Sequence, residues 1–317
     1  AALAGRRLKV AVVMGGDSPE REVSLHSGEA VAQGLRDAGC EVTEVVLQSE
    51  DLSALNGYDG DAVFIALHGG FGEDGRIQGR LEERGLVYTG SGPAASQRAM
   101  NKLLSRSIFG KRGVPMPGYI EIKKEEGEEE IKKRVAEFGY PVVVKPVAEG
   151  SSIGVSIVED ERHLPDALRL AFSYGEQAIV EEYIDGREVT VGILDNEALP
   201  IIELKPRRQF FDYTAKYQKG ETEYIVKPPL PDEIRREIKK VALAAYRALG
   251  ASGFSRVDMM LTKENQPVVL EVNTIPGFTS TSLVPMAAKE VGISFPQLCR
   301  RIVELAIEAF ARNKGGV

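Results

Sequence analysis

Alternating strands and helices in the first hundred residues place the strongest constraint on the fold of this chain. Short apolar runs rich in β-branched residues predict buried strands near residues 8–14, 41–47 and 62–67. A helix is predicted between the first two strands, with Ser18 as its N-cap and Pro19 in its first turn. This βαβ pattern predicts a parallel sheet, and sheets of that kind bind ligands at the carboxyl ends of their strands.

After about residue 99 the pattern changes to short strands joined by turns. These expected strands cover residues 141–145, 154–158, 178–183, 188–194 and 198–203, and they indicate antiparallel sheet. Helices are expected at residues 100–111, 232–249 and 296–311. The aromatic and charged segment 205–227 has no periodicity, which predicts a long loop of the kind that often serves as a lid.

The fold class predicted from these patterns is α/β (α+β overall), with three domains. The parallel sheet would occupy residues 1–98, a central domain residues 99–184, and a C-terminal domain residues 185–317.

Charge and cysteine content limit the class of partner. The 317 residues carry 40 Lys and Arg against 47 Asp and Glu, a net charge of −7, which argues against binding nucleic acid or an anionic membrane. Cys40 and Cys299 are too few for a disulfide framework and fit a reducing compartment. No apolar run approaches the roughly 20 residues of a membrane-spanning helix, and we expect no targeting segment. The chain is therefore expected to be a cytoplasmic enzyme or binding protein.

The segment 253–275 predicts a hairpin with one polar face. A two-residue turn at residues 264–265 would pair Val257 with Val272, Met259 with Leu270, and Leu261 with Val268, all on an apolar face. The other face then sets Asp258 across from Glu271, and Arg256 across from Asn273. A set of Asp, Glu and Asn offers only oxygen ligands, which suits Mg²⁺ or Mn²⁺. The alternative is an ordinary solvent-facing side of a hairpin.

Two glycine-rich segments are candidate phosphate-binding loops. Residues 145–154 join two expected strands, and their small side chains would let backbone N–H groups approach phosphate oxygens. A plain flexible turn is the alternative. Gly70, Gly72 and Gly75 match the spacing of a dinucleotide-binding loop, but they follow the third strand, whereas such loops usually follow the first.

His68 and Glu20 each allow a structural and a functional interpretation. His68 ends a buried strand beside two glycines, which favours a ligand contact as much as a structural role. Glu20 lies in the first turn of a helix, where it complements the helix dipole, but it also lies at a strand's carboxyl end and could bind an ammonium group. The two cysteines are expected to be inert core residues.

These features together resemble the D-alanine–D-alanine ligase family of the ATP-grasp superfamily, over essentially the whole chain. The matching stretches are residues 15–28, 64–75, 88–92, 101–106, 141–155, 210–217, 253–261 and 270–288. The resemblance implies an ATP-grasp fold with a Rossmann-like N-terminal domain, ATP and two Mg²⁺ (or Mn²⁺) ions as cofactors, and a homodimer. It also implies a reaction, in which ATP phosphorylates one D-alanine and the amine of a second D-alanine displaces the phosphate, for peptidoglycan precursor synthesis.

The resemblance assigns nucleotide and metal contacts residue by residue. Lys102 and Lys145 would contact the nucleotide, with Ser152 from the glycine-rich flap and Lys216 from the lid. Adenine would be read by Glu181 and the backbone of Ile184, and the ribose hydroxyls by Glu188. Asp258, Glu271 and Asn273 would bind the two metal ions.

The resemblance also assigns the amino-acid contacts. Glu20 would hold the first ammonium group and form a network with Ser151 and Tyr217 that closes the site. Arg256 and the backbone N–H of Gly277 would stabilise the tetrahedral oxyanion. The second carboxylate would be bound by Ser282 and the backbone of Leu283, and His68 would line the first site.

Three alternatives stay open from the sequence. The chain could be a different ATP-grasp carboxylate–amine ligase, or a D-alanine–D-lactate ligase, or a non-catalytic nucleotide-binding regulator. The pair Lys216-Tyr217 in the lid favours an amine acceptor over D-lactate. The presence of Lys102, Lys145, Arg256, Asp258 and Glu271 weakens the regulator hypothesis.

Overall fold

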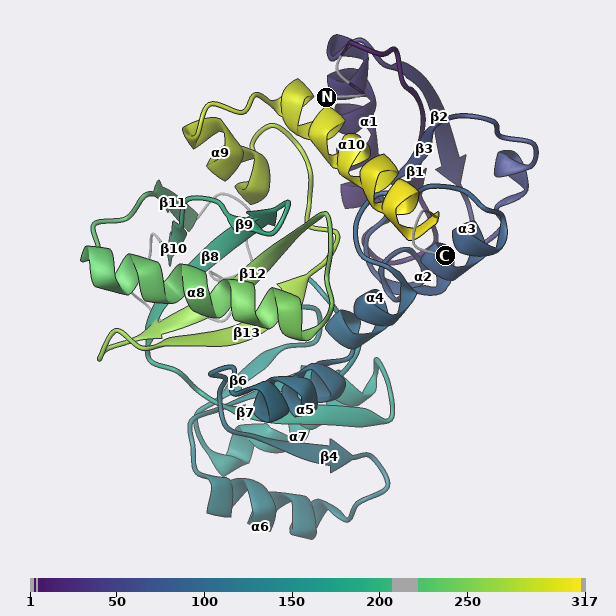
Figure 1. Ribbon diagram of the computed structural model, residues 1–317. Helices are drawn as coiled ribbons and strands as arrows, with labels where there is room; N and C mark the ends of the chain where they lie inside the picture. The colour runs from purple at the N-terminus through teal and green to yellow at the C-terminus, as the bar shows by residue number, and fades with distance from the viewer. Residues whose placement is uncertain (1–2, 4, 207–221, 315–317) are drawn as a thin grey trace.

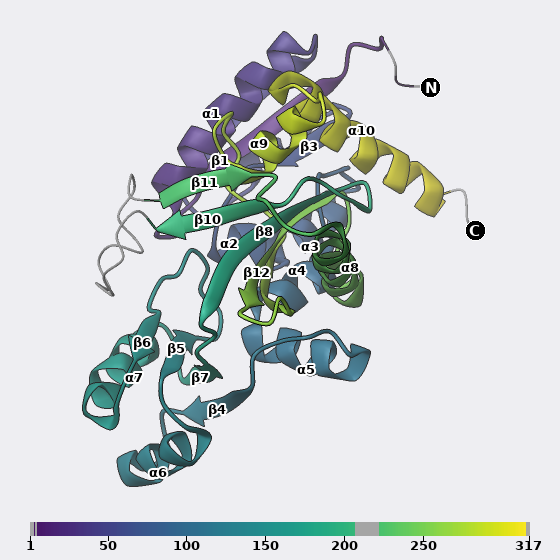
Figure 2. The same cartoon turned by 90° about the vertical axis from the view of Figure 1, so that its left-hand side faces the viewer.

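The computed structural model describes residues 3, 5–206 and 222–314, and three sheets organise this part of the chain (Figure 1). The first sheet lies near α1 and α10. The second lies with α6 and α7 at the opposite end of the molecule in both views (Figures 1 and 2). The third sheet lies between them. None of the described helices is long and apolar enough to cross a membrane.

The first sheet is parallel, as the βαβ pattern predicted. Its strands β1 (Lys9–Gly15), β2 (Glu41–Leu47) and β3 (Ala62–Ile65) lie in the order β2-β1-β3. Helix α1 (Arg21–Asp37) packs on β1, and the last helix of the chain, α10 (Phe295–Lys314), packs on α1 and β3. The short elements η1 (Ser53–Leu55), α2 (Gly70–Glu73), α3 (Arg76–Glu83) and α4 (Pro93–Met100) complete this part.

The predicted N-cap of α1 is wrong by two residues. The helix begins at Arg21, with Glu20 in the N-cap position. The hydroxyl of Ser18 accepts a hydrogen bond from the N–H of Glu20 at 3.2 Å and donates to the carbonyl of His68 at 2.6 Å. Ser18 therefore joins the start of α1 to the turn that follows β3.

The second sheet is antiparallel, in the order β4-β7-β5-β6. Its strands are β4 (Tyr119–Lys123), β5 (Val142–Pro146), β6 (Ser156–Val158) and β7 (Gln177–Glu182), and its helices are α5 (Lys102–Arg112), α6 (Glu128–Phe138) and α7 (Leu164–Phe172), with η2 (Glu161–His163) before α7. The helix predicted at residues 100–111 is confirmed as α5, which begins two residues later than predicted, whereas α4 directly before it was not predicted. Asn101 ends α4 and caps α5 by accepting a hydrogen bond from the N–H of Leu104, because an Asn side chain competes for backbone donors.

The third sheet runs β11-β10-β8-β12-β13, with β9 paired to β8. Its strands are β8 (Gly186–Leu194), β9 (Glu197–Ala198), β10 (Ile202–Pro206), β11 (Thr222–Val226), β12 (Phe254–Thr262) and β13 (Pro267–Asn273), with α8 (Asp232–Ala248) and α9 (Leu283–Glu290) packed against it. The prediction of a loop over the whole of 205–227 is wrong at both ends, where β10 and β11 pair in antiparallel fashion. Residues 207–221 between them lie outside the described residues.

The predicted hairpin register is correct near the polar residues and wrong near the turn. Arg256 pairs with Asn273 and Asp258 with Glu271, as predicted. Beyond a bulge, however, Met259 faces Val269 and Leu261 faces Pro267, which leaves Leu270 as an extra residue on β13. The turn has a third residue, with Asn265 at φ 60°, and this residue shifts the register by one until the bulge restores it.

The predicted domain boundaries stay predictions. The boundary after residue 98 falls within α4, and the one after residue 184 falls between β7 and β8. A cluster of phenylalanine rings joins the first sheet to the third, with Phe254 lying 6.3 Å from Phe64 and 5.5 Å from Phe278 between ring centres. Phe278 belongs to the loop of residues 274–282, which this cluster therefore fixes between the two sheets.

Candidate active site

A cleft of about 350 Å³ opens between the second and third sheets. Its wall combines strands β5, β7, β8, β12 and β13 with the glycine-rich flap that follows β5. Eleven of the predicted site residues line it: Lys102, Lys145, Ser151, Ser152, Glu181, Ile184, Glu188, Arg256, Asp258, Glu271 and Leu283. The structure thus brings together residues that are far apart in the sequence.

The remaining predicted residues have other positions. Asn273 borders a small adjoining cavity of about 20 Å³, together with Lys102 and Glu271. Glu20, His68, Gly277 and Ser282 are not among the residues that line the cleft. Lys216 and Tyr217 lie outside the described residues.

Glu181 is the centre of a buried ion-pair network. Its carboxylate lies 2.6 Å from Lys145 Nζ and accepts a hydrogen bond of 2.8 Å from Arg106 Nε. Burial would raise the pKa of Glu181, but the charges of Lys145 and Arg106 outweigh it and lower the pKa to about 2. Glu181 therefore holds the Lys145 ammonium in place, which the adenine prediction for its side chain did not foresee.

Arg106 is a site residue that sequence reasoning missed. It is 1 % exposed, and its Nη2 also donates to the carbonyl of Leu270, the bulge residue, at 2.7 Å. One guanidinium thus connects the second sheet to the strand that carries Glu271. The available signal was spacing, because Arg106 lies four residues after Lys102 on α5 and so shares its face.

Arg256 and Asp258 form a two-pronged ion pair on β12. Arg256 Nε and Nη2 donate to the two oxygens of Asp258 at 2.8 and 2.7 Å, and Thr190 Oγ1 donates to the same carboxylate at 2.7 Å. Burial would lower the pKa of Arg256, but the Asp258 charge raises it above its ordinary value. Arg256 is therefore a permanent cation at the cleft wall.

The donor set of Asp258, Glu271 and Asn273 fits magnesium by its chemistry. It supplies two carboxylates on directly paired positions and one amide oxygen, and Mg²⁺ prefers oxygen ligands. Asn273 Oδ1 accepts the N–H of Ile275 at 3.1 Å. Within residues 3, 5–206 and 222–314, no three His, Cys, Asp or Glu side chains form a group that could hold a metal ion by themselves. The amide oxygen of Asn273 and the phosphate oxygens of a bound nucleotide would therefore have to complete the site.

The glycine-rich flap is anchored to α5. Lys102 is 7 % exposed, and its ammonium donates to the carbonyl of Glu149, while its N–H donates to the carbonyl of Val147 at 2.9 Å. Burial lowers the pKa of Lys102. Ser151 and Ser152 both have left-handed backbone conformations, with φ 49° and 60°, which is unusual for residues other than glycine.

Glu20 contacts the flap across the cleft mouth. The hydroxyl of Ser151 donates to Glu20 Oε1, which joins two of the three members of the predicted closing network. A Cβ atom at Gly69 would lie 2.7 Å from Glu20 Oε2, so a glycine at that position lets the carboxylate approach the turn after β3. Glu20 is thus positioned by three segments of the chain.

His68 is buried and engaged at both ring nitrogens. Nδ1 lies 2.8 Å from the carbonyl of Ile275, and Nε2 lies 3.0 Å from the hydroxyl of Ser27. Burial lowers the pKa of His68 to about 4, against the Ile275 hydrogen bond, which favours the charged form. Ser27 also accepts the N–H of Phe278, next to Gly277, and sequence reasoning missed it.

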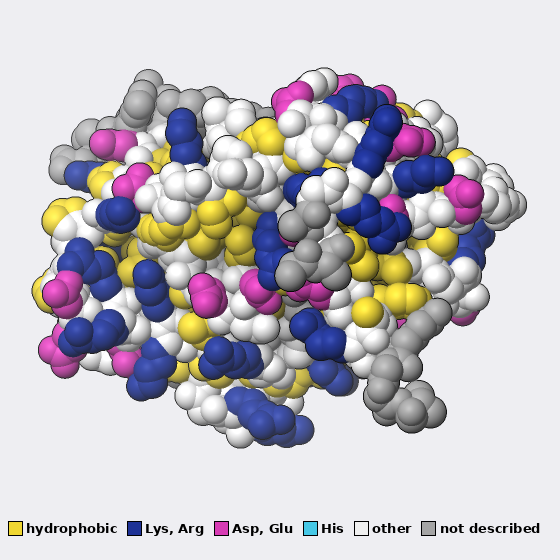
Figure 3. Space-filling model, turned by 45° about the horizontal axis from the view of Figure 1, so that its top comes forward, with side chains coloured by type: hydrophobic (Ala, Val, Ile, Leu, Met, Phe, Trp, Pro, Cys, Tyr) yellow, Lys and Arg dark blue, Asp and Glu magenta, His cyan; other side chains and the backbone are white. Residues whose placement is uncertain are grey.

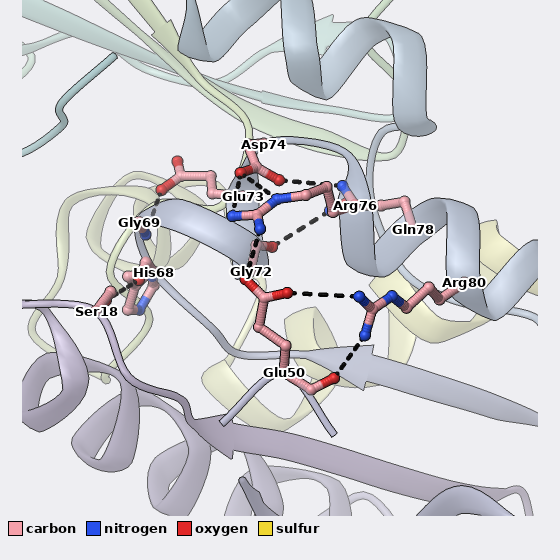
Figure 4. Close-up of polar contacts among 10 residues, drawn as sticks. All are labelled: Ser18, Glu50, His68, Gly69, Gly72, Glu73, Asp74, Arg76, Gln78 and Arg80. Atoms are coloured by element: carbon pink, nitrogen blue, oxygen red, sulfur yellow. Dashed lines mark hydrogen bonds and ion pairs between the residues drawn. The ribbon is translucent and has the colours of Figure 1, made fainter. Parts of the chain in front are cut away.

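The turn that matches the dinucleotide-binding spacing is filled by its own side chains (Figure 4). Glu73 Oε2 accepts the N–H of Gly69 at 2.9 Å, and Gln78 donates to the carbonyl of Gly72 at 3.3 Å. Burial raises the pKa of Glu73 to about 8, against the Gly69 hydrogen bond, which lowers it. These contacts favour a structural turn over a dinucleotide site.

Comparisons with known proteins find one family repeatedly. The family model described as the D-ala D-ala ligase C-terminus matches residues 108–304. The chain is 46 % identical over 308 residues to a D-alanine–D-alanine ligase of Geobacter sulfurreducens, covering 97 % of this chain and 96 % of that protein.

Solved structures are similar over the same extent. A D-alanine–D-alanine ligase of Bacillus anthracis matches with a TM-score of 0.86 and 37 % identity over 96 % of this chain and 99 % of that one. The structure of that ligase in complex with ATP matches with a TM-score of 0.85 and 34 % identity, over 96 % and 99 % of the two chains. The VanG D-Ala:D-Ser ligase of Enterococcus faecalis matches with 0.82 and 31 % identity over 95 % and 100 % of the two chains.

Proposed function

The chain belongs to the D-alanine–D-alanine ligase family, and we propose that it joins two D-alanine molecules at the cleft between the second and third sheets, with ATP as the second substrate. D-alanyl-D-alanine for peptidoglycan precursor synthesis is the product. The observation that carries the proposal is the convergence of Lys102, Lys145, Arg256, Asp258 and Glu271 on one cleft.

The proposed reaction has two steps, phosphoryl transfer to the first D-alanine and attack by the amine of the second. A carboxylate oxygen of the first D-alanine attacks the γ-phosphorus of ATP, and the bond from that phosphorus to ADP breaks, which gives an acylphosphate. The amine of the second D-alanine, having lost a proton, attacks the carbonyl carbon, and the bond to the phosphate oxygen breaks. Phosphoryl transfer spreads negative charge over its oxygens, so cations in fixed positions accelerate it.

The nucleotide subsite is proposed along the second sheet. Lys102 and Lys145 contact the phosphates of the nucleotide. Ser152, on the flap, contacts the same phosphates, and Lys216 adds a positive charge from the lid. Glu181 and the backbone of Ile184 contact the adenine, and Glu188 the ribose. Because the Glu181 carboxylate is also bound by two cations, it supports nucleotide binding a second time through its hold on Lys145.

Asp258, Glu271 and Asn273 are proposed to hold two Mg²⁺ or Mn²⁺ ions. A bound divalent ion would neutralise phosphate charge during transfer. Asp258 keeps a compensating cation, Arg256, in contact with it in the structure.

The amino-acid subsites are proposed at the mouth of the cleft. Glu20 holds the first ammonium, with Ser151 and Tyr217 closing over it and His68 bordering the pocket. Arg256 and the N–H of Gly277 donate to the oxyanion of the tetrahedral intermediate, and Ser282 with the backbone of Leu283 binds the second carboxylate. Closing the cleft matters physically because water would otherwise hydrolyse the acylphosphate.

The test is phosphate release with Mg-ATP and a panel of D-alanine, D-serine, D-lactate and other amino acids. Release that requires D-alanine, with the dipeptide as product, is the expected result. Equal or faster turnover with D-lactate would overturn the acceptor assignment. No release with any member of the panel would favour the non-catalytic regulator.

A homodimer in the cytoplasm is proposed alongside this activity. The family resemblance supports the dimer, and the two buried free cysteines support a reducing compartment. The net charge of −7 supports a small-molecule substrate over a nucleic acid or membrane partner. On the face drawn in Figure 3, Lys and Arg side chains are spread over the surface with Asp and Glu among them.

A further inference from the structure

The hydrogen bonds around His68 define which ring nitrogen carries its proton. The carbonyl of Ile275, 2.8 Å from Nδ1, can only accept, so Nδ1 carries the hydrogen. Nε2 is then the acceptor, and the Ser27 hydroxyl, 3.0 Å away, is the donor. His68 thus joins α1 to the loop of residues 274–282.

Ser27 completes the connection with a second bond to the same loop. It is 1 % exposed on α1, and its oxygen accepts the N–H of Phe278 at 3.0 Å. A hydroxyl offers one donor and two acceptor positions, so donating to His68 and accepting from Phe278 are compatible. Every hydrogen-bonding direction in this chain of contacts is therefore assigned.

The backbone that these bonds hold leads to Leu283, which lines the cleft. The N–H of Phe278 belongs to the peptide group that follows Gly277, so its hydrogen bond sets the orientation of that peptide. Further along the loop, Ser282 Oγ accepts the N–H of Thr279 at 3.0 Å, and Ser282 precedes α9. The Phe278 ring packs on Phe254 and Phe295, at 5.5 and 5.6 Å between ring centres, which fixes the side chain but not the peptide orientation.

We infer that Ser27 is a positioning residue for the ligase reaction. Through Phe278 and His68 it holds the loop of residues 274–282 so that the N–H of Gly277 and the hydroxyl of Ser282 stay in place for the intermediate and the second substrate. The inference rests on the proposed function, since that function gives Gly277 and Ser282 their roles. Small displacements of such groups cost rate because donors act only when aimed at the developing charge.

A measurement on the unaltered protein tests the geometry without using activity. Long-range proton–nitrogen NMR should show His68 with its hydrogen on Nδ1 and no titration between pH 8 and about 6. Hydrogen exchange should show a slow amide at Phe278, although this residue lies in a loop. A hydrogen on Nε2, or a Phe278 amide that exchanges as fast as an exposed turn, would overturn the inference.

Kinetics of Ser27→Ala test the positioning role. We expect kcat to fall by about tenfold to a hundredfold and KM for the second D-alanine to rise, while KM for ATP stays at the wild-type value. Ser27→Thr keeps the hydroxyl and should recover most of the loss.

The matched control is Ser24→Ala, one turn earlier on α1. Ser24 is equally buried, but its hydroxyl bonds the N–H of Gly15 and the carbonyl of Ala66, not the loop. We expect a similar loss of thermal stability with unchanged kinetics. Equal kinetic effects in the two variants would refute the inference. An unaltered protein that releases no phosphate would instead refute the proposed function, and the NMR result would still decide the hydrogen-bond chain.

Discussion

The carboxylate of Glu181 illustrates what one buried residue does for this site. It is 1 % exposed, yet it stays charged because Lys145 and Arg106 both contact it. The sequence predicted that Lys145 and Glu181 belong to one site. It could not predict their mutual contact or Arg106, because the first depends on the register between β5 and β7 and the second on a side chain from α5 reaching β7. No local pattern encodes either.

Removing Arg106 should therefore cost both stability and nucleotide binding. Arg106→Met leaves Glu181 with one cation and the Leu270 carbonyl without its donor, and we expect a loss of about 3–5 kcal/mol in the free energy of unfolding. Urea denaturation measures it. The double variant Arg106→Met/Glu181→Met should recover part of the loss, because it leaves no unpaired buried charge. A single variant as stable as the double would contradict the network.

Glu73 gives a prediction in pH. Its pKa is raised from 4.5 to about 8 by burial, so between these values the folded chain holds a proton that the unfolded chain has lost. Stability should therefore fall as pH rises from about 4.5 to 8. Glu73→Gln keeps an acceptor for the Gly69 N–H and removes the charge, and it should be more stable than wild type by about 4 kcal/mol at pH 8 and equal at pH 4.5. Melting curves at both pH values check this, and a parallel offset at both would contradict it.

At the scale of elements, the β12–β13 hairpin shows how far a sequence pattern can determine register. Alternation of apolar and polar residues correctly set Asp258 opposite Glu271. The pattern did not reveal that the turn has three residues or that Leu270 bulges out. The two deviations compensate, so they leave the polar end in register and change only the pairs between. A periodic pattern indicates only which face of the sheet a residue lies on. Because the bulge cancels the one-residue shift from the turn, the polar residues beyond it keep the predicted face and partners.

The function proposed for that polar face is tested by Glu271→Gln. We expect turnover to fall at least about a hundredfold, because magnesium loses a charged ligand at the phosphates, with the melting temperature nearly unchanged. Glu264→Gln, in the exposed turn of the same hairpin, is the control and should behave as wild type. Steady-state rates over a range of Mg²⁺ concentrations measure both variants. Near-normal rates and Mg²⁺ dependence in Glu271→Gln would remove the metal assignment.

At the scale of the whole molecule, the cleft belongs to two sheets at once. The parallel and antiparallel sheets could be predicted from residue patterns, because each strand carries its own signal. Their assembly could not, since it depends on long-range contacts such as Arg106 with Leu270 and Phe278 with Phe254. The sequence grouped residues from both sheets into one site only through the family resemblance, which carries the tertiary information that local patterns lack. Eleven of those residues line the cleft.

Nucleotide binding should therefore stabilise the molecule as a unit. Mg-ATP at about 100 times its dissociation constant should add about 2.7 kcal/mol, because the unfolded chain has no cleft to bind it. Scanning calorimetry measures the shift in melting temperature. Lys145→Met should lose most of this shift, and Lys124→Met, which removes an exposed ion pair with Glu176 on the second sheet, should keep it. An equal shift in the two variants would contradict the nucleotide subsite.

The packing of α10 on α1 has a consequence for the order in which the chain becomes structured during synthesis. A ribosome releases β1, α1 and β3 well before α10, yet the core they share includes Leu298, Cys299 and Ile302 of α10. Segments made early usually finish folding early. Here the first sheet emerges well before α10, the helix that completes its core, whereas the second sheet is made in between and has all its strands before α10 emerges. The first sheet is thus made before the second but completed after it, and its unfinished core stays exposed to other partners for longer.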